Sequence, residues 1–151
     1  MPDQNRGTLD TGKLDRVLEG YYPQMERDLL GLLTIPSVKE APAAGAPFGR
    51  PIADALAYSL AAAESLNFNT IDVDGHVGVI DLPGPEASQV GVLCHLDVVP
   101  ALAEEWAYPP YGAAIANGTI YGRGALDDKG PAIAALYALA ALRDCCAPLQ
   151  K

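Results

Sequence analysis

Hydrophobic residues near the start of the chain recur at the three-and-four spacing of one helical face. They are Leu14, Val17, Leu18, Tyr21, Met25, Leu29 and Leu32. A proline inside a helix removes one backbone hydrogen bond and clashes with the preceding turn, so Pro23 predicts a break or kink in this run. We therefore expect a short helix followed by a second helix, which ends before Pro36.

A loop, a helix and a hairpin are predicted next. Residues 36–51 contain four prolines and two glycines, which is a loop composition, and irregular segments of this length are often functional. Residues 52–66 are rich in Ala and Leu and predict an amphipathic helix. The β-prone runs 70–73 and 77–82 flank Asp74-Gly75, which predicts a hairpin turn.

The run VGVLC at positions 90–94 is apolar without any polar alternation. Such a run predicts a strand that is covered on both faces inside an α/β sheet. In open α/β sheets, ligands bind beyond the carboxyl ends of the strands, and the residues that follow this run are His95, Leu96 and Asp97. The pattern therefore indicates a site at the end of this strand.

Two more elements are predicted towards the end of the sequence. Asn117-Gly118 predicts a tight turn into the β-prone residues 119–121. Pro131 is a favoured first helical residue, and the run PAIAALYALAALRD that it opens predicts a helix apolar nearly all round. We expect that helix to be buried on every side. Since the sequence stops soon afterwards at Lys151, part of its cover is expected to belong to chain that is missing.

Composition excludes some partners. The 151 residues carry 10 Lys and Arg against 19 Asp and Glu, a formal net charge of −9, which argues against a nucleic acid or an anionic membrane surface as partner. No secretory signal or apolar stretch of membrane-spanning length is visible, so a soluble cytoplasmic protein is expected. Three cysteines, two of them adjacent at Cys145 and Cys146, predict reduced thiols.

His95 and Asp97 form the first group of chemistry-bearing residues. In an extended segment, residues two apart point to the same side, while Leu96 between them points away. A metal-binding imidazole usually donates its other N–H to a carboxylate, so Asp97 can be that carboxylate or a direct ligand. On the triplet alone, a histidine satisfied at a strand end is the simpler interpretation.

Asp127 and Asp128 form the second group. They stand between a Gly-rich turn and a predicted helix start, where adjacent carboxylates repel unless one meets a cation or a helix N-terminus. One of them can cap the helix, so a capping role and a ligand role are compatible.

Three motifs together resemble the M20 family of metallopeptidases: HLDVVPA, then W-x-x-P-P-Y, then IYGRGALDDKGP. The match extends from about Met25 to the end of the sequence, and the motifs agree in residue type, order and separation. The loop SVKEAPAAGAPFG is similar to the dipeptidase (PepV/Sapep-like) branch of that family.

The resemblance implies a site with two divalent metal ions, Zn²⁺ being the expected metal with Mn²⁺ or Co²⁺ as alternatives. It implies that His95 is a ligand of one ion, that Asp97 is the catalytic carboxylate behind it, and that Asp127 bridges the two ions. It places Asp128 in a supporting role and implies a cis peptide bond between the paired aspartates. The implied fold is a mixed-sheet, zinc-peptidase-like α/β catalytic domain with helices on both faces. Residues 1–151 would be its N-terminal part, without the C-terminal half and without the lid or dimerisation domain.

The implied activity is metal-dependent hydrolysis of dipeptides or other small peptides. The alternatives are an M20 deacylase of N-acyl amino acids and a truncated remnant without catalysis. In the family, the general base belongs to a Glu-Glu pair after the next strand, which would lie beyond Lys151, and no residue after Asp128 replaces it. Glu104 and Glu105 are expected to be solvated. Cys94 is expected to be a buried small side chain and not a nucleophile, because adjacent strand residues face opposite ways.

Overall fold

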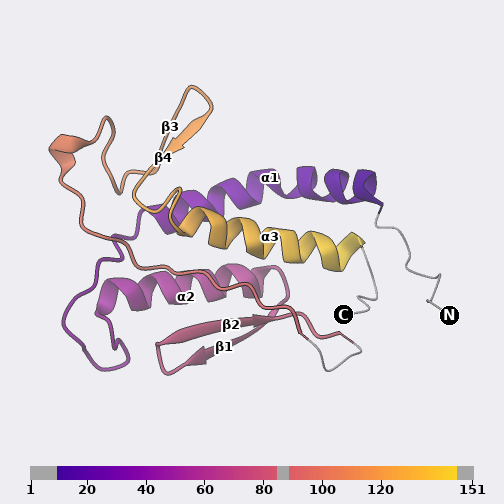
Figure 1. The fold of residues 1–151 in the computed structure, drawn as a ribbon, viewed down its shortest axis with the longest axis horizontal. Helices are drawn as coiled ribbons and strands as arrows, with labels where there is room; N and C mark the ends of the chain where they lie inside the picture. The colour runs from indigo at the N-terminus through magenta and orange to yellow at the C-terminus, as the bar shows by residue number, and fades with distance from the viewer. Residues whose placement is uncertain (1–9, 85–88, 146–151) are drawn as a thin grey trace.

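A computed structural model of the chain describes residues 10–84 and 89–145. The helices of these residues are α1 (Thr11–Leu33), α2 (Arg50–Ser65) and α3 (Lys129–Cys145), and a short 3-10 turn, η1, spans Ala103–Glu105. The strands are β1 (Asn69–Val73), β2 (Val77–Asp81), β3 (Ala114–Ala116) and β4 (Thr119–Tyr121), paired as two antiparallel hairpins. In Figure 1, α3 lies between α1 and α2, and the β1–β2 hairpin runs along the other side of α2. This mixture of helices and small antiparallel sheets is compatible with an incomplete α/β domain.

The predicted break at Pro23 is wrong, because α1 continues through this residue. Contacts with α3 hold the helix on both sides of the proline. Before it, the ring of Tyr21 packs edge-on against Tyr137 with centroids 5.5 Å apart, and after it Asp28 accepts a hydrogen bond of 2.6 Å from the Tyr137 hydroxyl. Tertiary packing therefore offsets the local cost of the proline.

The core is formed where α1, α2 and α3 meet. Its buried members are Leu32, Ala55, Ala62, Ala63, Leu66, Phe68, Ile133, Leu136, Tyr137 and Ala140. The expectation that α3 is buried on every side is wrong for one stripe, since Pro131, Ala134 and Ala138 are exposed. These residues recur at helical spacing on the face that no other described element covers.

Most of the predicted local elements are confirmed. Helix α2, the β1–β2 hairpin and strand β4 have nearly the predicted bounds, whereas β3 was not predicted. Asn117 and Gly118 take the positive φ values of 52° and 73° that a tight hairpin turn requires. Gly78 lies against α2 so closely that a Cβ there would come within 2.7 Å of the Leu56 side chain. The β1–β2 hairpin is therefore docked on α2 through one of its faces.

The predicted strand at 90–94 is wrong in this structure, since these residues form no regular secondary structure. The exposed fractions of Val90, Val92 and Leu93 are 87%, 73% and 94%. A buried strand needs neighbouring strands along its edges, and within residues 10–84 and 89–145 no backbone hydrogen bond joins 90–94 to another segment.

In the same part of the chain, no helix is long and apolar enough to cross a membrane.

Candidate functional site

His95 and Asp127 come together from segments far apart in the sequence. His95 follows the extended segment 90–94, and Asp127 lies just before α3. The Nε2 atom of His95 is 3.0 Å from Oδ1 of Asp127. About half of the His95 side chain and 85% of the Asp127 side chain are exposed, so the pair faces solvent.

Asp97 occupies the other side of the same imidazole. The Nδ1 atom of His95 lies 3.0 Å from the backbone oxygen of Asp97 and 3.3 Å from its carboxylate Oδ1. The structure thus places a carboxylate behind the histidine, as one of the two interpretations of the His-x-Asp triplet requires. This is the arrangement that fixes the ring orientation of a metal-binding histidine.

The imidazole of His95 has acceptor atoms opposite both ring nitrogens. A neutral imidazole carries one N–H, so either tautomer leaves one nitrogen lone pair facing an oxygen at 3.0 Å. A second ring proton or a cation at Nε2 removes this repulsion. Partial burial lowers the pKa of His95, but the hydrogen bonds with Asp127 and Asp97 and their charges outweigh burial, so its pKa is raised.

Asp128 binds the backbone of the histidine. Its Oδ2 atom accepts a hydrogen bond of 3.0 Å from the N–H of His95, while its own backbone oxygen accepts from Ala132 in the first turn of α3. The peptide bond between Asp127 and Asp128 is cis, as the family resemblance implied. The two adjacent carboxylates therefore contact different groups of one residue, the ring and the main chain of His95.

Ser37 fixes the segment that carries His95 and Asp97. Its hydroxyl donates a hydrogen bond of 2.6 Å to the backbone oxygen of Leu96, and its own backbone oxygen accepts one of 3.0 Å from Val98. Leu96 packs against the hydrophobic core, which confirms that it points away from the two polar side chains. The polar side of the triplet is therefore turned outward by contacts on its apolar side.

Lys129 fixes the segment that carries the two aspartates. Its side chain has no exposed surface, and its Nζ donates hydrogen bonds of 3.0 and 2.6 Å to the backbone oxygens of Leu32 and Ile35 at the end of α1. Burial lowers the pKa of Lys129 to about 8. Both site-bearing segments are thus tied to one short stretch, residues 32–37, which we call the α1 anchor turn.

Neither Ser37 nor Lys129 was singled out by sequence reasoning. A lysine at the start of a helix opposes the helix dipole, so Lys129 did carry a signal that its charge is used elsewhere. Ser37 lies in a proline-rich loop and carried no such signal. Within the described residues, these two are the buried polar or charged side chains.

The other candidates behave as ordinary residues. Cys94 is partly buried, and burial together with the nearby Asp128 raises the pKa of its thiol, which disfavours the nucleophilic thiolate. Glu104 and Glu105 are exposed in η1, as expected. Cys94 and Cys145 are free, and Cys146 lies outside the described residues.

The donor set fits part of a metal site. His95 Nε2 and the Asp127 carboxylate converge on one region, and imidazole with carboxylate is a suitable pair of ligands for Zn²⁺. A catalytic zinc usually has three protein ligands, and the described ranges contain no cluster of three or more His, Cys, Asp or Glu residues able to hold an ion. The residues therefore supply one side of a metal site.

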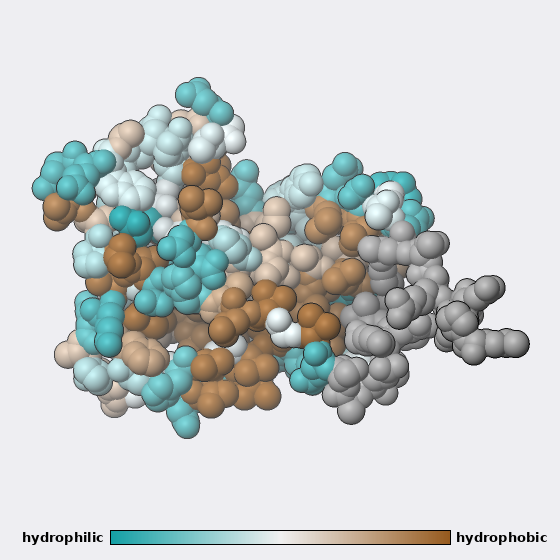
Figure 2. All heavy atoms as spheres, in the orientation of Figure 1, coloured by the Kyte–Doolittle hydropathy of each residue, from teal (hydrophilic) through white to brown (hydrophobic). Residues whose placement is uncertain are grey.

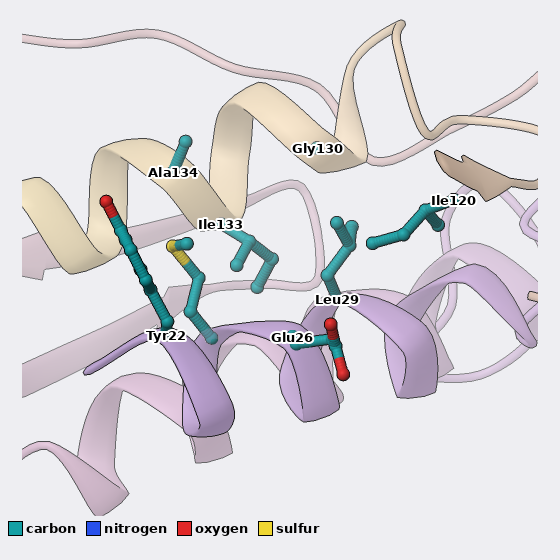
Figure 3. A pocket seen from close by; sticks show the side chains of 8 residues that line it. Tyr22, Glu26, Leu29, Ile120, Gly130, Ile133 and Ala134 are labelled. Atoms are coloured by element: carbon teal, nitrogen blue, oxygen red, sulfur yellow. The ribbon is translucent and has the colours of Figure 1, made fainter. Parts of the chain in front are cut away.

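A groove of about 310 Å³ lies between α1 and α3 (Figure 3). Its lining residues are Tyr22, Met25, Glu26, Leu29, Ile120, Gly130, Ile133 and Ala134. The walls are mainly apolar, and neither His95 nor the aspartates line it. The groove is therefore no part of the candidate site.

Comparisons with known proteins agree with the site motifs. The model of the peptidase family M20/M25/M40 matches residues 91–148, a range that includes His95, Asp97 and Asp127. Two relatives are each named "Putative dipeptidase". The protein YtjP of Bacillus subtilis is 43% identical over 127 residues, covering 83% of this chain and 27% of the relative. A Staphylococcus epidermidis protein is 41% identical over 132 residues, covering 86% of this chain and 28% of the relative. The chain thus spans little more than a quarter of the length of these relatives.

Proposed function

The chain belongs to the peptidase family M20/M25/M40, and on this premise we propose that it supplies the His95, Asp97 and Asp127 side of a centre for metal-dependent hydrolysis of dipeptides or other small peptides. One observation carries the proposal. Two ring nitrogens of one histidine meet Asp127 and Asp97 at 3.0 to 3.3 Å, in the relative positions of a metal ligand and an orienting carboxylate.

Each residue has one role in the proposal. His95 and Asp127 would hold divalent metal ions, and Asp97 would orient the imidazole. Asp128 fixes the main chain of His95 through the hydrogen bond to its N–H. When bound, divalent ions would polarise the scissile carbonyl and activate an attacking water. We propose Zn²⁺ as the metal, because imidazole and carboxylate suit it, with Mn²⁺ and Co²⁺ to be compared in the assay.

For residues 1–151 by themselves, a specific observation favours a second candidate function, in which this stretch alone catalyses no reaction. The described residues supply two metal donors, and a general base must lie within hydrogen-bond reach of its water. Glu104 and Glu105, the carboxylates that the sequence offered for this role, are exposed in η1. We therefore propose that these residues act as the N-terminal part of one catalytic domain, and that its remaining part supplies the other ligands and the base.

A chimera tests the proposal. This chain replaces the matched stretch of the Bacillus subtilis relative, and the chimera and the unmodified relative are assayed with dipeptides and with N-acyl amino acids in Zn²⁺, Mn²⁺ or Co²⁺. We expect dipeptide hydrolysis that a chelator abolishes. Preferential cleavage of N-acyl amino acids would instead identify a deacylase. If the chimera is inactive while the unmodified relative is active, the result would support a truncated remnant without catalysis.

Variants of the chimera test the residues. We expect Asp97→Asn to lower kcat/KM by about 10- to 100-fold and His95→Ala to lower it further. His76→Ala is the matched control, because His76 lies exposed in the β1–β2 turn and should leave kcat/KM unchanged. Activity that survives His95→Ala would contradict the proposed role of this ring.

We also propose a cytoplasmic location, in keeping with the free thiols of Cys94 and Cys145.

A further inference from the structure

Two arginines of the described chain stack on aromatic rings but differ in their other contacts. The guanidinium carbon of Arg143 lies 4.8 Å from the ring centroid of Phe68. That of Arg123 lies 4.9 Å from the ring centroid of Trp106. Arg143 also donates hydrogen bonds to a backbone oxygen and, at 2.8 Å, to the carboxylate of Asp144. Among the described residues, Arg123 forms no ion pair and its buried Nε has no hydrogen-bond partner.

The stacked arrangement leaves the edge of the Arg123 guanidinium for a ligand. Trp106 covers one face of the planar group, while the N–H donors lie in its plane. Donors in that plane match the two oxygens of a carboxylate. A partly buried cationic donor without an acceptor costs free energy, and a bound carboxylate would offset that cost.

The loop that carries Trp106 is held against the end of β4. The N–H of Arg123 donates a hydrogen bond of 2.6 Å to the backbone oxygen of Pro110. The rings of Tyr108 and Tyr121 lie with their centroids 4.7 Å apart. The W-x-x-P-P-Y motif and the IYGRG motif therefore meet in space, and their contacts fix the indole beside the guanidinium.

Arg123 begins next to the candidate site. A Cβ added at Gly124, the following residue, would come within 2.8 Å of the Lys129 side chain and 3.2 Å of the Val98 side chain. Val98 directly follows the His-x-Asp triplet, and Lys129 directly follows the paired aspartates. The main chain of Arg123 is therefore one residue from the point where both site-bearing segments meet.

The surroundings of the stacked pair suit a charged ligand. Figure 2 shows a largely pale to teal surface over η1 and the β3–β4 hairpin, while apolar side chains gather over and beside the β1–β2 hairpin. The chain has a formal net charge of −9 and repels anionic peptides in general. An unpaired guanidinium beside the site is a local exception to that repulsion.

We propose that Arg123, stacked on Trp106, forms a specificity subsite for the side-chain carboxylate of an acidic residue in the peptide substrate. The reaction itself rests on the proposed function, and the subsite adds a preference for glutamate or aspartate over the corresponding amides. Glutamate and glutamine have nearly the same shape, so the charge-assisted hydrogen bonds to the guanidinium provide the discrimination.

Trp106 provides a direct binding test, because it is the single tryptophan of the 151-residue chain. The probe is N-acetylglutamate α-amide, whose only carboxylate is the side chain, and N-acetylglutamine α-amide is its neutral counterpart. We expect a saturable change of tryptophan fluorescence with the acidic probe and binding at least about tenfold weaker with the neutral one. Equal binding of both probes, or no saturable change with either, would overturn the proposal.

Variants of the chain locate the binding group. Arg123→Gln should remove the difference between the two probes, and Arg123→Lys, which keeps the charge but loses the planar fork, should reduce it. Arg143→Gln is the matched control, because Arg143 also stacks on a ring but already has its acceptors. Circular dichroism checks that each variant is folded. A folded Arg123 variant with undiminished selectivity would contradict the subsite.

Kinetics of the chimera separate the subsite from the proposed function. The substrates are Ala-Glu against Ala-Gln and Glu-Ala against Gln-Ala. We expect kcat/KM to favour the acidic member of one pair by about tenfold, mainly through KM, and Arg123→Gln to abolish this preference. Hydrolysis of both pairs without preference would overturn the subsite and leave the proposed function standing. Selective binding by the chain beside an inactive chimera would support the carboxylate site and count against the proposed function.

A carboxylate of the protein itself is the competing occupant of Arg123. In that case Arg123→Gln would lower kcat/KM equally for the acidic and the neutral peptides, because the substrate would not contact the guanidinium. Such a uniform loss would overturn the proposal.

Discussion

The two halves of the segment 90–98 differ sharply although both are rich in apolar residues. Val92 is 73% exposed, and Val98 is 7% exposed. The second half is held by Ser37 on one side and by Asp128 on the other, while within the described residues the first half has no backbone partner. Apolar composition therefore sets what a segment can bury, and the groups that pair with it decide whether it does.

Among the substitutions that test how these segments are held, replacing Lys129 should have the largest effect on stability. Lys129→Met keeps an unbranched apolar side chain of nearly the same length but leaves two backbone oxygens of the α1 anchor turn without their donor. We expect the free energy of unfolding to fall by about 3 kcal/mol, measured by urea denaturation. Lys13→Met is the control, because Lys13 is exposed and its side chain makes one hydrogen bond, which joins the other end of α1 to α3. Similar stabilities for both variants would show that the buried ammonium does not anchor the turn.

A pair of valine truncations compares the two halves directly. Val98→Ala removes buried methyl groups and should cost about 2 kcal/mol. Val92→Ala should change the free energy of unfolding of the isolated chain by less than about 0.5 kcal/mol, because its side chain is already in water. Thermal unfolding of the two variants side by side provides the measurement, and equal costs would mean that the first half is buried in solution.

Removing the hydroxyl of Ser37 should have the smallest effect. Ser37→Ala leaves the backbone oxygen of Leu96 without its partner, and we expect a loss of about 1 kcal/mol. Amide exchange at Val98 should rise together with this loss. Ser59→Ala is the matched control, since the Ser59 hydroxyl donates only to Ala55 in its own helix. If the exchange rate of the Val98 amide is unchanged, Ser37 does not position His95 and Asp97.

Local sequence rules predicted the elements whose structure is decided locally. Helix α2 and the turn at Asn117-Gly118 follow from propensity and turn chemistry, and α3 was predicted as a helix, although it begins at Lys129 and not at Pro131. The continuity of α1 through Pro23 was not predicted, because contacts with Tyr137 on α3 decide it. Segment 90–94 has a strand pattern, but a pattern cannot supply the neighbours that a strand needs.

The geometry of the candidate site was only partly predictable from the sequence. The His-x-Asp spacing correctly placed Asp97 beside His95, and the motif order of the family placed Asp127 with them. Spacing could not show that Asp128 binds the main chain of His95, because that contact depends on how α3 packs on α1. For the same reason Lys129 became visible as an anchor only in three dimensions.

The α1 anchor turn also sets a limit for engineering this chain. Residues 32–37 join α1 to the long loop before α2, a place where loop grafts and circular permutants are normally attempted because surface loops accept insertions. Here an insertion between Leu32 and Ser37 would separate the acceptors of Lys129 from the donor to Leu96. Grafts that begin after Val38 would keep both connections, so the tolerant part of this loop starts only beyond its first proline.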